Sequence, residues 1–179
     1  MKRLKILIVS KFLYARGGAE VYAMNLGEML QKQEHEVCFF SMHHPQNIHV
    51  NEDEYFAKEV SFFQPSISGK INAALRIFGT GIKRNYEKIL DDFQPDIVHI
   101  FGTEFPHTLA MVKAFGNPER TLIGIQGLCS AIAQVYMADL PSNVCKKKTF
   151  RDIIKKDGLL EQQEKFVQRG KYEKEAIAM

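Results

Sequence analysis

Residues 4–41 read LKILIVSKFLYARGGAEVYAMNLGEMLQKQEHEVCFFS, and this stretch decides the fold class. Its first seven residues, 4–10, form an apolar run rich in β-branched side chains, which predicts a strand buried on both faces. Apolar residues then recur at helical spacing from Ala19 to Gln33, and residues 35–41 read as a second strand. A strand, a glycine-containing turn, a helix and a strand with short connections form a βαβ unit, whose two strands are parallel.

The remainder of the chain continues this alternation of strands and helices. The patterns predict a short third strand near Val60–Phe63, a helix over Ile71–Phe93, strands over Pro95–Gly102 and Thr121–Gly127, and a charged helix over Leu159–Met179. A short helix is expected within residues 128–141, and Thr149 with Asp152 has the pattern of a capping box. This order of elements predicts a single α/β domain, with a doubly wound, Rossmann-like, mostly parallel sheet and helices on both faces.

The composition is that of an ordinary globular protein, with 179 residues of which 45% are apolar and 25% charged. No uncharged apolar stretch reaches the ~18 residues of a membrane-spanning helix, and the first residues lack the cleavage site of a signal peptide. The cysteines at 38, 129 and 145 fit neither a disulfide framework nor a zinc site. We therefore expect a protein of the reducing cytoplasm.

A basic run lies in the last third of the chain, where six Lys or Arg residues fall within Lys146–Lys156. We favour a solvated helix face for this run. The alternative is contact with anionic lipid at the inner face of the membrane, or with a phosphorylated acceptor.

Ligands of doubly wound sheets bind at the carboxyl ends of the strands, where neighbouring connections diverge. Three loops are expected to meet at that edge, namely Lys11–Gly18, Gly102–Glu104 and Gln126–Leu128. Gly17 and Gly18 precede a helix, so their bare backbone and the helix N-terminus suit a diphosphate or a sugar oxygen. The pair is neither GxGxxG nor a Walker A motif, and a structural role is equally open. We expect the glycines primarily to let the strand turn sharply into the helix.

Several side chains near these loops are candidates for binding. Lys11 and Arg16 flank the glycines and would pair with phosphate, although plain surface charge is the favoured alternative for each. Glu104 would act as a base or bind sugar hydroxyls, with a favourable first-turn carboxylate as the alternative. His99 is expected in the core, and His107 is expected to face either the cleft or solvent. The sequence offers no arrangement of a catalytic triad or of metal ligands.

The opening stretch resembles the N-terminal domain of family 4 glycosyltransferases of the GT-B fold, with GGAE at residues 17–20 as its most specific part. PDIVHIFGTEFPHTLAMVKAFG at residues 95–116 and TLIGIQGLCS at residues 121–130 are similar to the fourth and fifth strands of that family and their following loops. Such enzymes pair two Rossmann-like domains across a cleft. The resemblance covers nearly all of residues 1–179 and implies an acceptor-side domain that stops before its last strand or strands and lacks the C-terminal donor domain.

Seven residues at the carboxyl edge of the sheet are expected to bind substrate. The resemblance implies that Gly17 and Gly18 lie at the donor diphosphate, where the charge of Arg16 is expected to contribute. It implies that Thr103, Glu104 and Gln126 lie at the acceptor, where the charge of Lys11 is expected to contribute. Family members often carry a histidine where this chain has Gln126, so no catalytic residue is assigned.

The resemblance also implies a reaction. Enzymes of this type move a hexose from a nucleotide sugar to a glycan or lipid-linked acceptor with retention of configuration, as in polysaccharide biosynthesis, and they need no metal or other cofactor. Residues 1–179 alone are expected to transfer little or no sugar. Two alternatives stay open: a single-domain binding module that partners a separate donor-binding chain, and an unrelated nucleotide-binding domain of doubly wound type.

Overall fold

The computed structural model describes residues 2–42, 44–48, 56–57, 80–103, 106–155 and 158–179. Its strands are β1 (Lys5–Val9), β2 (Glu36–Met42), β3 (Phe56–Ala57), β4 (Ile97–Phe101) and β5 (Thr121–Gly124). Its helices are α1 (Gly18–Lys32), α3 (Thr80–Phe93), α4 (Pro106–Phe115), α5 (Cys129–Val135), α6 (Ser142–Cys145), α7 (Phe150–Lys155) and α8 (Leu159–Ile177), with the 3₁₀ helix η1 (Pro118–Arg120).

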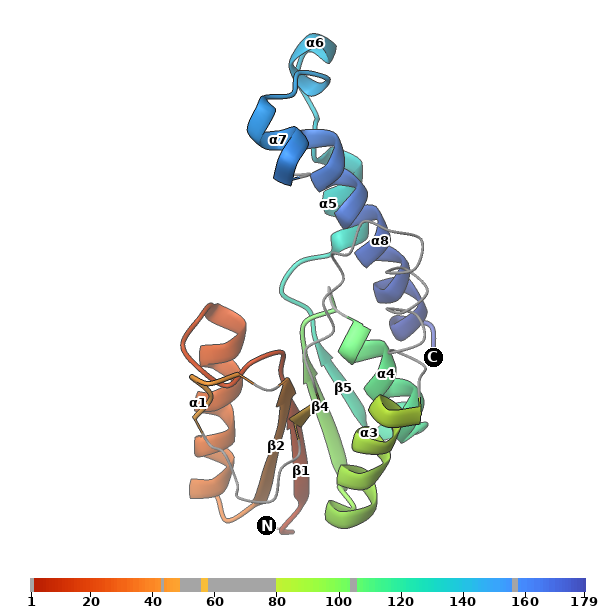
Figure 1. Cartoon of the computed structure of the whole chain (residues 1–179). Helices are drawn as coiled ribbons and strands as arrows, with labels where there is room; N and C mark the ends of the chain where they lie inside the picture. Colours follow the sequence, from red (N-terminus) through yellow and green to blue (C-terminus); the bar gives the residue numbers. More distant parts are fainter. Residues whose placement is uncertain (1, 43, 49–55, 58–79, 104–105, 156–157) are drawn as a thin grey trace.

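The five strands form one parallel sheet in the order β3-β2-β1-β4-β5 (Figure 1). In the centre, Leu7 of β1 is paired with Cys38 of β2 on one side and with Val98 of β4 on the other. The chain therefore first builds outward from β1 to β3, and then crosses over to add β4 and β5. This is the predicted doubly wound topology, and it places a switch point at the carboxyl ends of β1 and β4.

Alternate side chains of β1 enter two separate cores, one on each face of the sheet. Leu7 and Val9 belong to the cluster beneath α3 and α4, and Ile6 and Ile8 belong to the cluster beneath α1. Leu7, Ile8 and Val9 are completely buried. A strand that is covered on both faces needs apolar residues at every position, which explains the continuous apolar run in this part of the sequence.

Helix α1 approaches the sheet closely because Gly27 has no side chain. A Cβ at this position would lie 2.3 Å from Cζ of Phe39 and 3.1 Å from Cδ1 of Ile8. The same helix face buries Ala23 and Met24. Gly27 is thus a packing residue, in contrast to the two glycines at the start of the helix.

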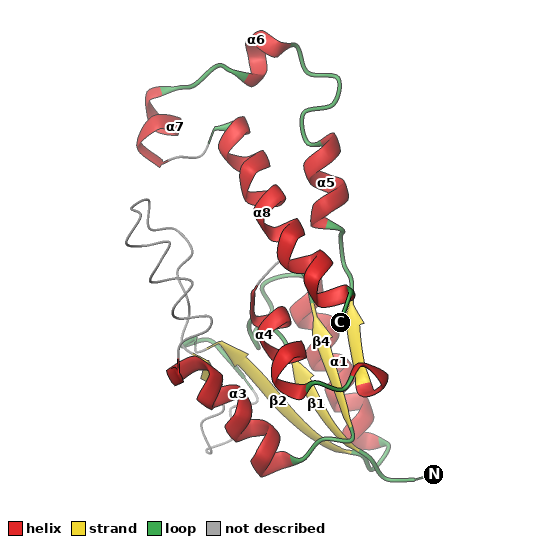
Figure 2. Ribbon diagram, turned by 90° about the vertical axis from the view of Figure 1, so that its right-hand side faces the viewer, coloured by secondary structure: helices red, strands yellow, loops and turns green. Residues whose placement is uncertain are grey.

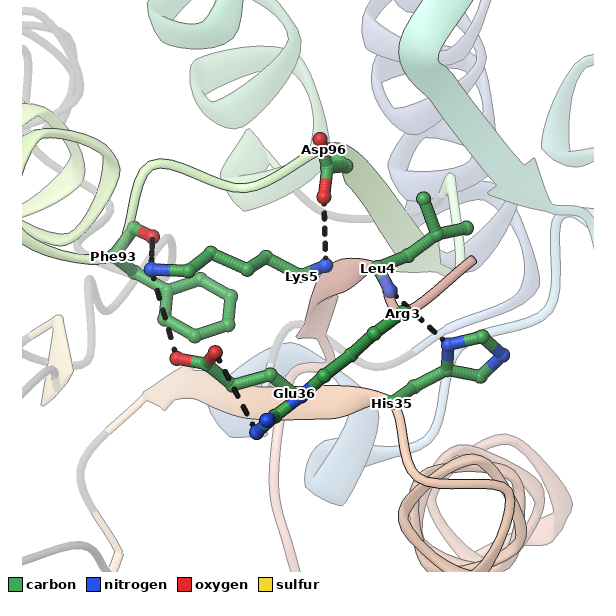
Figure 3. Close-up of polar contacts among 7 residues, drawn as sticks. All are labelled: Arg3, Leu4, Lys5, His35, Glu36, Phe93 and Asp96. Carbon is green, nitrogen blue, oxygen red and sulfur yellow. Dashed lines mark hydrogen bonds and ion pairs between the residues drawn. The ribbon is translucent and has the colours of Figure 1, made fainter. Parts of the chain in front are cut away.

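A polar cluster closes the amino end of the sheet, opposite the loops that were expected to bind ligand (Figure 3). The backbone N–H of Lys5 donates a hydrogen bond of 2.8 Å to the carboxylate of Asp96, and its ammonium group donates to the carbonyl of Phe93 at 3.3 Å. The same ammonium group lies 3.6 Å from the carboxylate of Glu36, which also faces Arg3 at 3.9 Å. These contacts connect the starts of β1, β2 and β4.

Residues 129–177, called the helical arm below, extend beyond the carboxyl edge of the sheet (Figures 1 and 2). Helices α5 and α8 lie side by side as its antiparallel shaft, and α6 and α7 lie at its far end. A Cβ at Gly170 would lie 2.9 Å from Cα of Ser130, so the two helices touch through their backbones at the base. Higher up, the rings of Tyr136 and Phe166 pack with centroids 5.2 Å apart.

Most predicted elements are confirmed. The predicted third strand near 60–63 lies outside the described residues, and the short described strand β3 is at Phe56–Ala57. The helix predicted over 71–93 is described only from Thr80 to Phe93. The capping box is confirmed: the N–H of Thr149 donates to the carboxylate of Asp152 at 2.8 Å, and the N–H of Asp152 donates back to the hydroxyl of Thr149 at 3.2 Å.

Candidate functional site

The carboxyl edge of the sheet brings together the start of α1 and the loop after β5. A Cβ at Gly18 would lie 3.9 Å from the side-chain oxygen of Gln126, although the two residues are far apart in the sequence. Gly17, Gly18 and Gln126 are all exposed. The predicted meeting of these two loops is therefore confirmed, and they form a solvent-facing rim, called the glycine rim below.

The backbone of the glycine pair corrects one expectation. Gly17 is the N-cap of α1 with φ −154° and ψ 179°, an extended conformation that any residue adopts. Only Gly102 and Gly116 have positive φ among the glycines of the described residues. The prediction that the pair is needed for a sharp turn is thus wrong, and Gly102, with φ 87° directly after β4, meets such a need instead.

What the pair provides is open space at a helix N-terminus. No side chain caps α1 at Gly17, and the nearest atom to a Cβ at that position would be Oε2 of Glu20, at 3.1 Å. The first N–H groups of a helix lack intrahelical partners and carry a partial positive charge, which favours an anion. The carboxylate of Glu20 shares this region and opposes a second negative charge.

Two basic residues of the loop lie on one aromatic ring. Nζ of Lys11 is 5.0 Å from the ring centroid of Phe12, and the guanidinium carbon of Arg16 is 4.9 Å from it. Phe12 is itself buried, whereas Arg16 is exposed and Lys11 half-buried. Both cations therefore lie over the same ring in cation–π contacts.

An aromatic stack that the sequence reasoning missed lies beside these cations. The rings of Tyr14 and His44 stack with centroids 4.5 Å apart and an interplanar angle of 21°. Phe12 contacts both, at 5.4 Å from Tyr14 and 5.2 Å from His44. No local pattern in the sequence indicates this cluster, because His44 comes from the loop after β2 and meets the other two residues only through strand pairing.

His107 does not face the cleft or solvent, which corrects the expectation for this residue. Its side chain is only 3% exposed. Burial and the charge of Lys11 together lower the pKa of His107 to about 4, against the opposing effect of a hydrogen bond with the backbone of Phe101. The imidazole is therefore neutral at neutral pH. His99 is half-buried and stacks on Phe101 with centroids 4.4 Å apart, and its burial also lowers its pKa.

Thr103 lies in the interior at the end of β4, and its hydroxyl donates a hydrogen bond of 2.9 Å to Glu173 of α8. The hydroxyl that was predicted to contact an acceptor thus has an internal partner. Glu104, the neighbouring candidate, lies outside the described residues.

Glu173 is the polar centre of the base of the arm. Its carboxylate also accepts hydrogen bonds from the N–H of Cys129 at 2.8 Å, and from the N–H and hydroxyl of Ser130 at 3.1 and 2.6 Å. Burial acts to raise the pKa of Glu173, but the hydrogen bonds from Ser130, Cys129 and Thr103 together lower it. The sequence reasoning missed this residue, because a single glutamate in a charged helix has no distinguishing pattern.

Two of the pockets that described residues line lie away from the glycine rim. One of about 290 Å³ lies between α5 and α8 and is lined by residues such as Ser130, Val167 and Gly170. The other, of about 330 Å³, lies at the amino end of the sheet beside Arg120. Within the described part of the chain, no group of three or more His, Cys, Asp or Glu side chains is placed to hold a metal ion.

The sequence that forms this parallel sheet, with an uncapped helix N-terminus at its switch point, matches a known protein family. The family model for Glycosyltransferase Family 4 matches residues 16–123. The chain belongs to glycosyltransferase family 4. The match begins at Arg16, directly before the glycine pair, and ends within β5 of this family 4 chain. No curated protein matches the chain.

Membership of family 4 confirms the resemblance and excludes the alternative of an unrelated nucleotide-binding domain. The matched segment contains α1, β2, β3, α3, β4 and α4 and most of β5, so Gly17 and Gly18 lie just inside its start, and Gln126 follows shortly after its end. The helical arm of this family 4 chain follows the matched segment. Among the described helices, none is long and apolar enough to cross a membrane.

Proposed function

We propose that this chain is the acceptor-side domain of a retaining family 4 glycosyltransferase. The enzyme moves a hexose from a nucleotide sugar to a glycan or lipid-linked acceptor, as in polysaccharide biosynthesis. The family match supports sugar transfer as the class of reaction. The location of the site rests on one observation: Gly18 and Gln126 lie close together at the carboxyl edge of the sheet.

The donor diphosphate approaches the start of α1 in this proposal. The absence of side chains at Gly17 and Gly18 lets phosphate oxygens reach the backbone N–H groups, where the helix dipole favours negative charge. Arg16, held 4.9 Å from the Phe12 ring centroid, adds a positive charge beside them. Helix N–H groups and basic side chains neutralise the leaving diphosphate, so the reaction needs no metal.

The acceptor occupies the other side of the rim in this proposal. The amide of Gln126 has both a donor and an acceptor, and it hydrogen-bonds a sugar hydroxyl. Lys11 contributes positive charge next to it, which suits an acceptor that carries a phosphate. Glu104 belongs to the same group, and Thr103 holds the loop in place through its internal hydrogen bond.

Residues 1–179 alone are proposed to be inactive. In the family the partner domain supplies most contacts to the donor and closes the cleft, which excludes water from the reaction. A lone rim that offers a helix N-terminus and one or two cations binds a nucleotide sugar weakly, with Kd on the order of millimolar or weaker. The donor-binding domain is supplied by a further segment or by a separate chain.

The experiment is a titration of the ¹⁵N-labelled chain with UDP-glucose and GDP-mannose, followed by NMR. We expect weak, saturable shifts of the amides of Gly17, Gly18 and Gln126. Gly18→Val fills the space above the backbone and is expected to reduce these shifts. Glu20→Gln removes the opposing carboxylate and is expected to strengthen binding. Glu34→Gln is the matched control for the charge, because Glu34 is exposed just beyond the opposite end of α1.

Two results would overturn the proposal. Shifts that are confined to the amino end of the sheet would place the nucleotide elsewhere. Tight, stoichiometric binding of the nucleotide sugar in calorimetry would show that the chain does not need a partner domain for its donor.

A further inference from the structure

Helix α7, at the far end of the helical arm, turns its apolar side to solvent. Phe150, Ile153 and Ile154 are spaced i, i+3 and i+4, so they share one face of the helix. They are 78, 60 and 66% exposed. An amphipathic helix of a globular protein normally buries this face against its core, and here no described part of the chain covers it.

The segment that precedes α7 in the sequence also exposes apolar side chains. Leu140 and Val144, just before and within α6, are 42 and 41% exposed. Residues 140–155 are called the tip below. Single exposed apolar side chains are common, but a group of five on one short segment is the kind of patch that marks a binding surface.

The tip is also strongly basic. Residues 140–155 contain five Lys or Arg residues and only one acidic residue, Asp152. The carboxylate of Asp152 is occupied, because it accepts the 2.8 Å hydrogen bond from the N–H of Thr149 that caps α7. Lys148 forms an ion pair with Glu161 of α8, which fixes the connection between tip and shaft. Lys146, Lys147 and Arg151 are exposed beside the apolar residues.

We propose that the tip docks on the surface of an anionic lipid bilayer. Exposed apolar side chains with cations around them have the chemistry of an interfacial membrane contact: the apolar groups enter the headgroup region while Lys and Arg pair with anionic lipids. The excess of one charge sign at the end of a projecting arm favours a flat anionic surface over a concave protein partner. The inference is independent of the sugar-transfer reaction.

The position of the tip gives this docking a consequence for the site. The arm rises from the carboxyl edge of the sheet, which is also the edge of the glycine rim (Figure 2). The 19 residues of α8 span about 28 Å at 1.5 Å per residue. A docked tip therefore places the rim on the membrane-facing end of the domain, at roughly the length of one helix from the lipid. A lipid-linked acceptor extending from the bilayer would meet the domain at this end.

The experiment is sedimentation of the full chain with vesicles of phosphatidylcholine alone, and with an equimolar mixture of phosphatidylcholine and phosphatidylglycerol. We expect binding to the mixed vesicles at about 0.05 M salt, weaker binding at about 0.5 M salt, and little binding to phosphatidylcholine alone. The charge variant Lys146→Gln, Lys147→Gln, Arg151→Gln is expected to lose about 100-fold in affinity. The apolar variant Phe150→Ser, Ile153→Ser, Ile154→Ser is expected to lose at least about tenfold.

The matched control lies on α1, where Met29 is 48% exposed and Lys32 is exposed next to it. The variant Met29→Ser, Lys32→Gln removes one apolar and one basic side chain and is expected to bind like the wild type. Because all substituted side chains are exposed, far-UV circular dichroism and thermal unfolding are expected to be unchanged in every variant.

Three results would overturn the proposal. The first is equal binding to both kinds of vesicle. The second is a loss of binding in the α1 control as large as that in the tip variants. The third is an absence of vesicle binding together with a concentration-dependent self-association that the tip variants abolish, which would make the tip a contact between copies of this chain. None of these results bears on the NMR titration of the glycine rim, so the two proposals fail separately.

Discussion

The hydroxyl of Thr103 at the end of β4 donates a hydrogen bond of 2.9 Å to the carboxylate of Glu173 near the end of α8, 70 residues later in the chain. Because the same carboxylate also accepts from Cys129 and Ser130 at the start of α5, it connects both helices of the arm shaft to the sheet. This carboxylate, on a side chain that is only 1% exposed, is therefore one of the contacts that set the orientation of the arm relative to the sheet.

Replacing this carboxylate is expected to destabilise the protein. Glu173→Ala leaves the hydroxyl of Thr103 and the donors of Cys129 and Ser130 without their acceptor in a buried site, which costs about 3 kcal/mol in the free energy of unfolding. Glu175→Ala is the control on the same helix: Glu175 forms an exposed 2.5 Å ion pair with Lys113, worth less than about 1 kcal/mol. Urea denaturation measures both, and equal effects would contradict the role assigned to Glu173.

Stability is expected to fall as the pH drops from 6.5 toward 4. The unfolded chain protonates His107 near its ordinary pKa of 6.5, whereas burial and Lys11 hold the pKa in the folded protein at about 4. The unfolded state thus binds more protons than the folded state between pH 6.5 and 4. The contribution of His107 to the free energy of unfolding, about 3 kcal/mol, is therefore complete above pH 6.5 and is lost progressively below it.

His107→Leu is expected to remove most of this slope, as measured by denaturation at several pH values. A smaller slope of the same sign is expected to remain, because burial also lowers the pKa of His99. Measurements between pH 6.5 and 4.5 separate the effect of these histidines from that of Glu173. Hydrogen bonding lowers the pKa of Glu173 below 4.5, so the contribution of this carboxylate to stability is present above pH 4.5 and is lost below it. An unchanged slope in His107→Leu would show that the imidazole is not buried in its neutral form.

Two Gly→Ala substitutions on α1 are expected to change the free energy of unfolding by different amounts. At Gly27 the new methyl group would lie 2.3 Å from Cζ of Phe39, a buried ring that has no room to move. Overpacking outweighs the gain in helix propensity, with a net loss of about 1–3 kcal/mol. At Gly18 the nearest atom is 3.9 Å away, and the change is expected to stay within about 0.5 kcal/mol. Thermal unfolding compares the two, and a stable Gly27→Ala variant would contradict the close contact of α1 with the sheet.

The three cysteines are expected to react at different rates with a thiol reagent at about pH 8. Cys38 and Cys129 are buried, and burial raises the pKa of the Cys38 thiol to about 11, so that little thiolate forms. Cys145, within the tip, is half-exposed. One thiol is therefore expected to react rapidly and two only after unfolding. Cys145→Ser should abolish the rapid phase, and a second rapid thiol would contradict the burial of the other two.

Strands and helices with local signals could be predicted from the sequence. The run at residues 4–10 contains β1 (Lys5–Val9), and the helix predicted over 159–179 contains α8 (Leu159–Ile177). The meeting of Gly18 and Gln126 could also be predicted, because parallel strands end at the same edge of a sheet. In these cases the decisive property is a pattern of neighbouring residues or a rule of topology.

Contacts between distant residues could not be predicted in this way. The partners of Glu173 lie 43, 44 and 70 positions away, and nothing in its own helix distinguishes it from the exposed glutamates. The burial of His107 depends on the rotation of α4 against the sheet, which no local pattern specifies. The prediction that Gly17 is needed for a sharp turn fails for a related reason. A glycine before a helix is compatible with both a forced turn and an open surface.

The central place of β1 also bears on how the chain emerges from the ribosome. The N–H of Lys5 bonds to Asp96, 91 residues later, so one side of β1 has no partner strand until that residue has been synthesised. At 5–20 residues per second the delay is about 5–20 s, during which the nascent βαβ unit presents a bare apolar strand edge. Chaperones that shield such edges would act on this protein before β4 leaves the exit tunnel, and slow codons between β2 and β4 would lengthen its dependence on them.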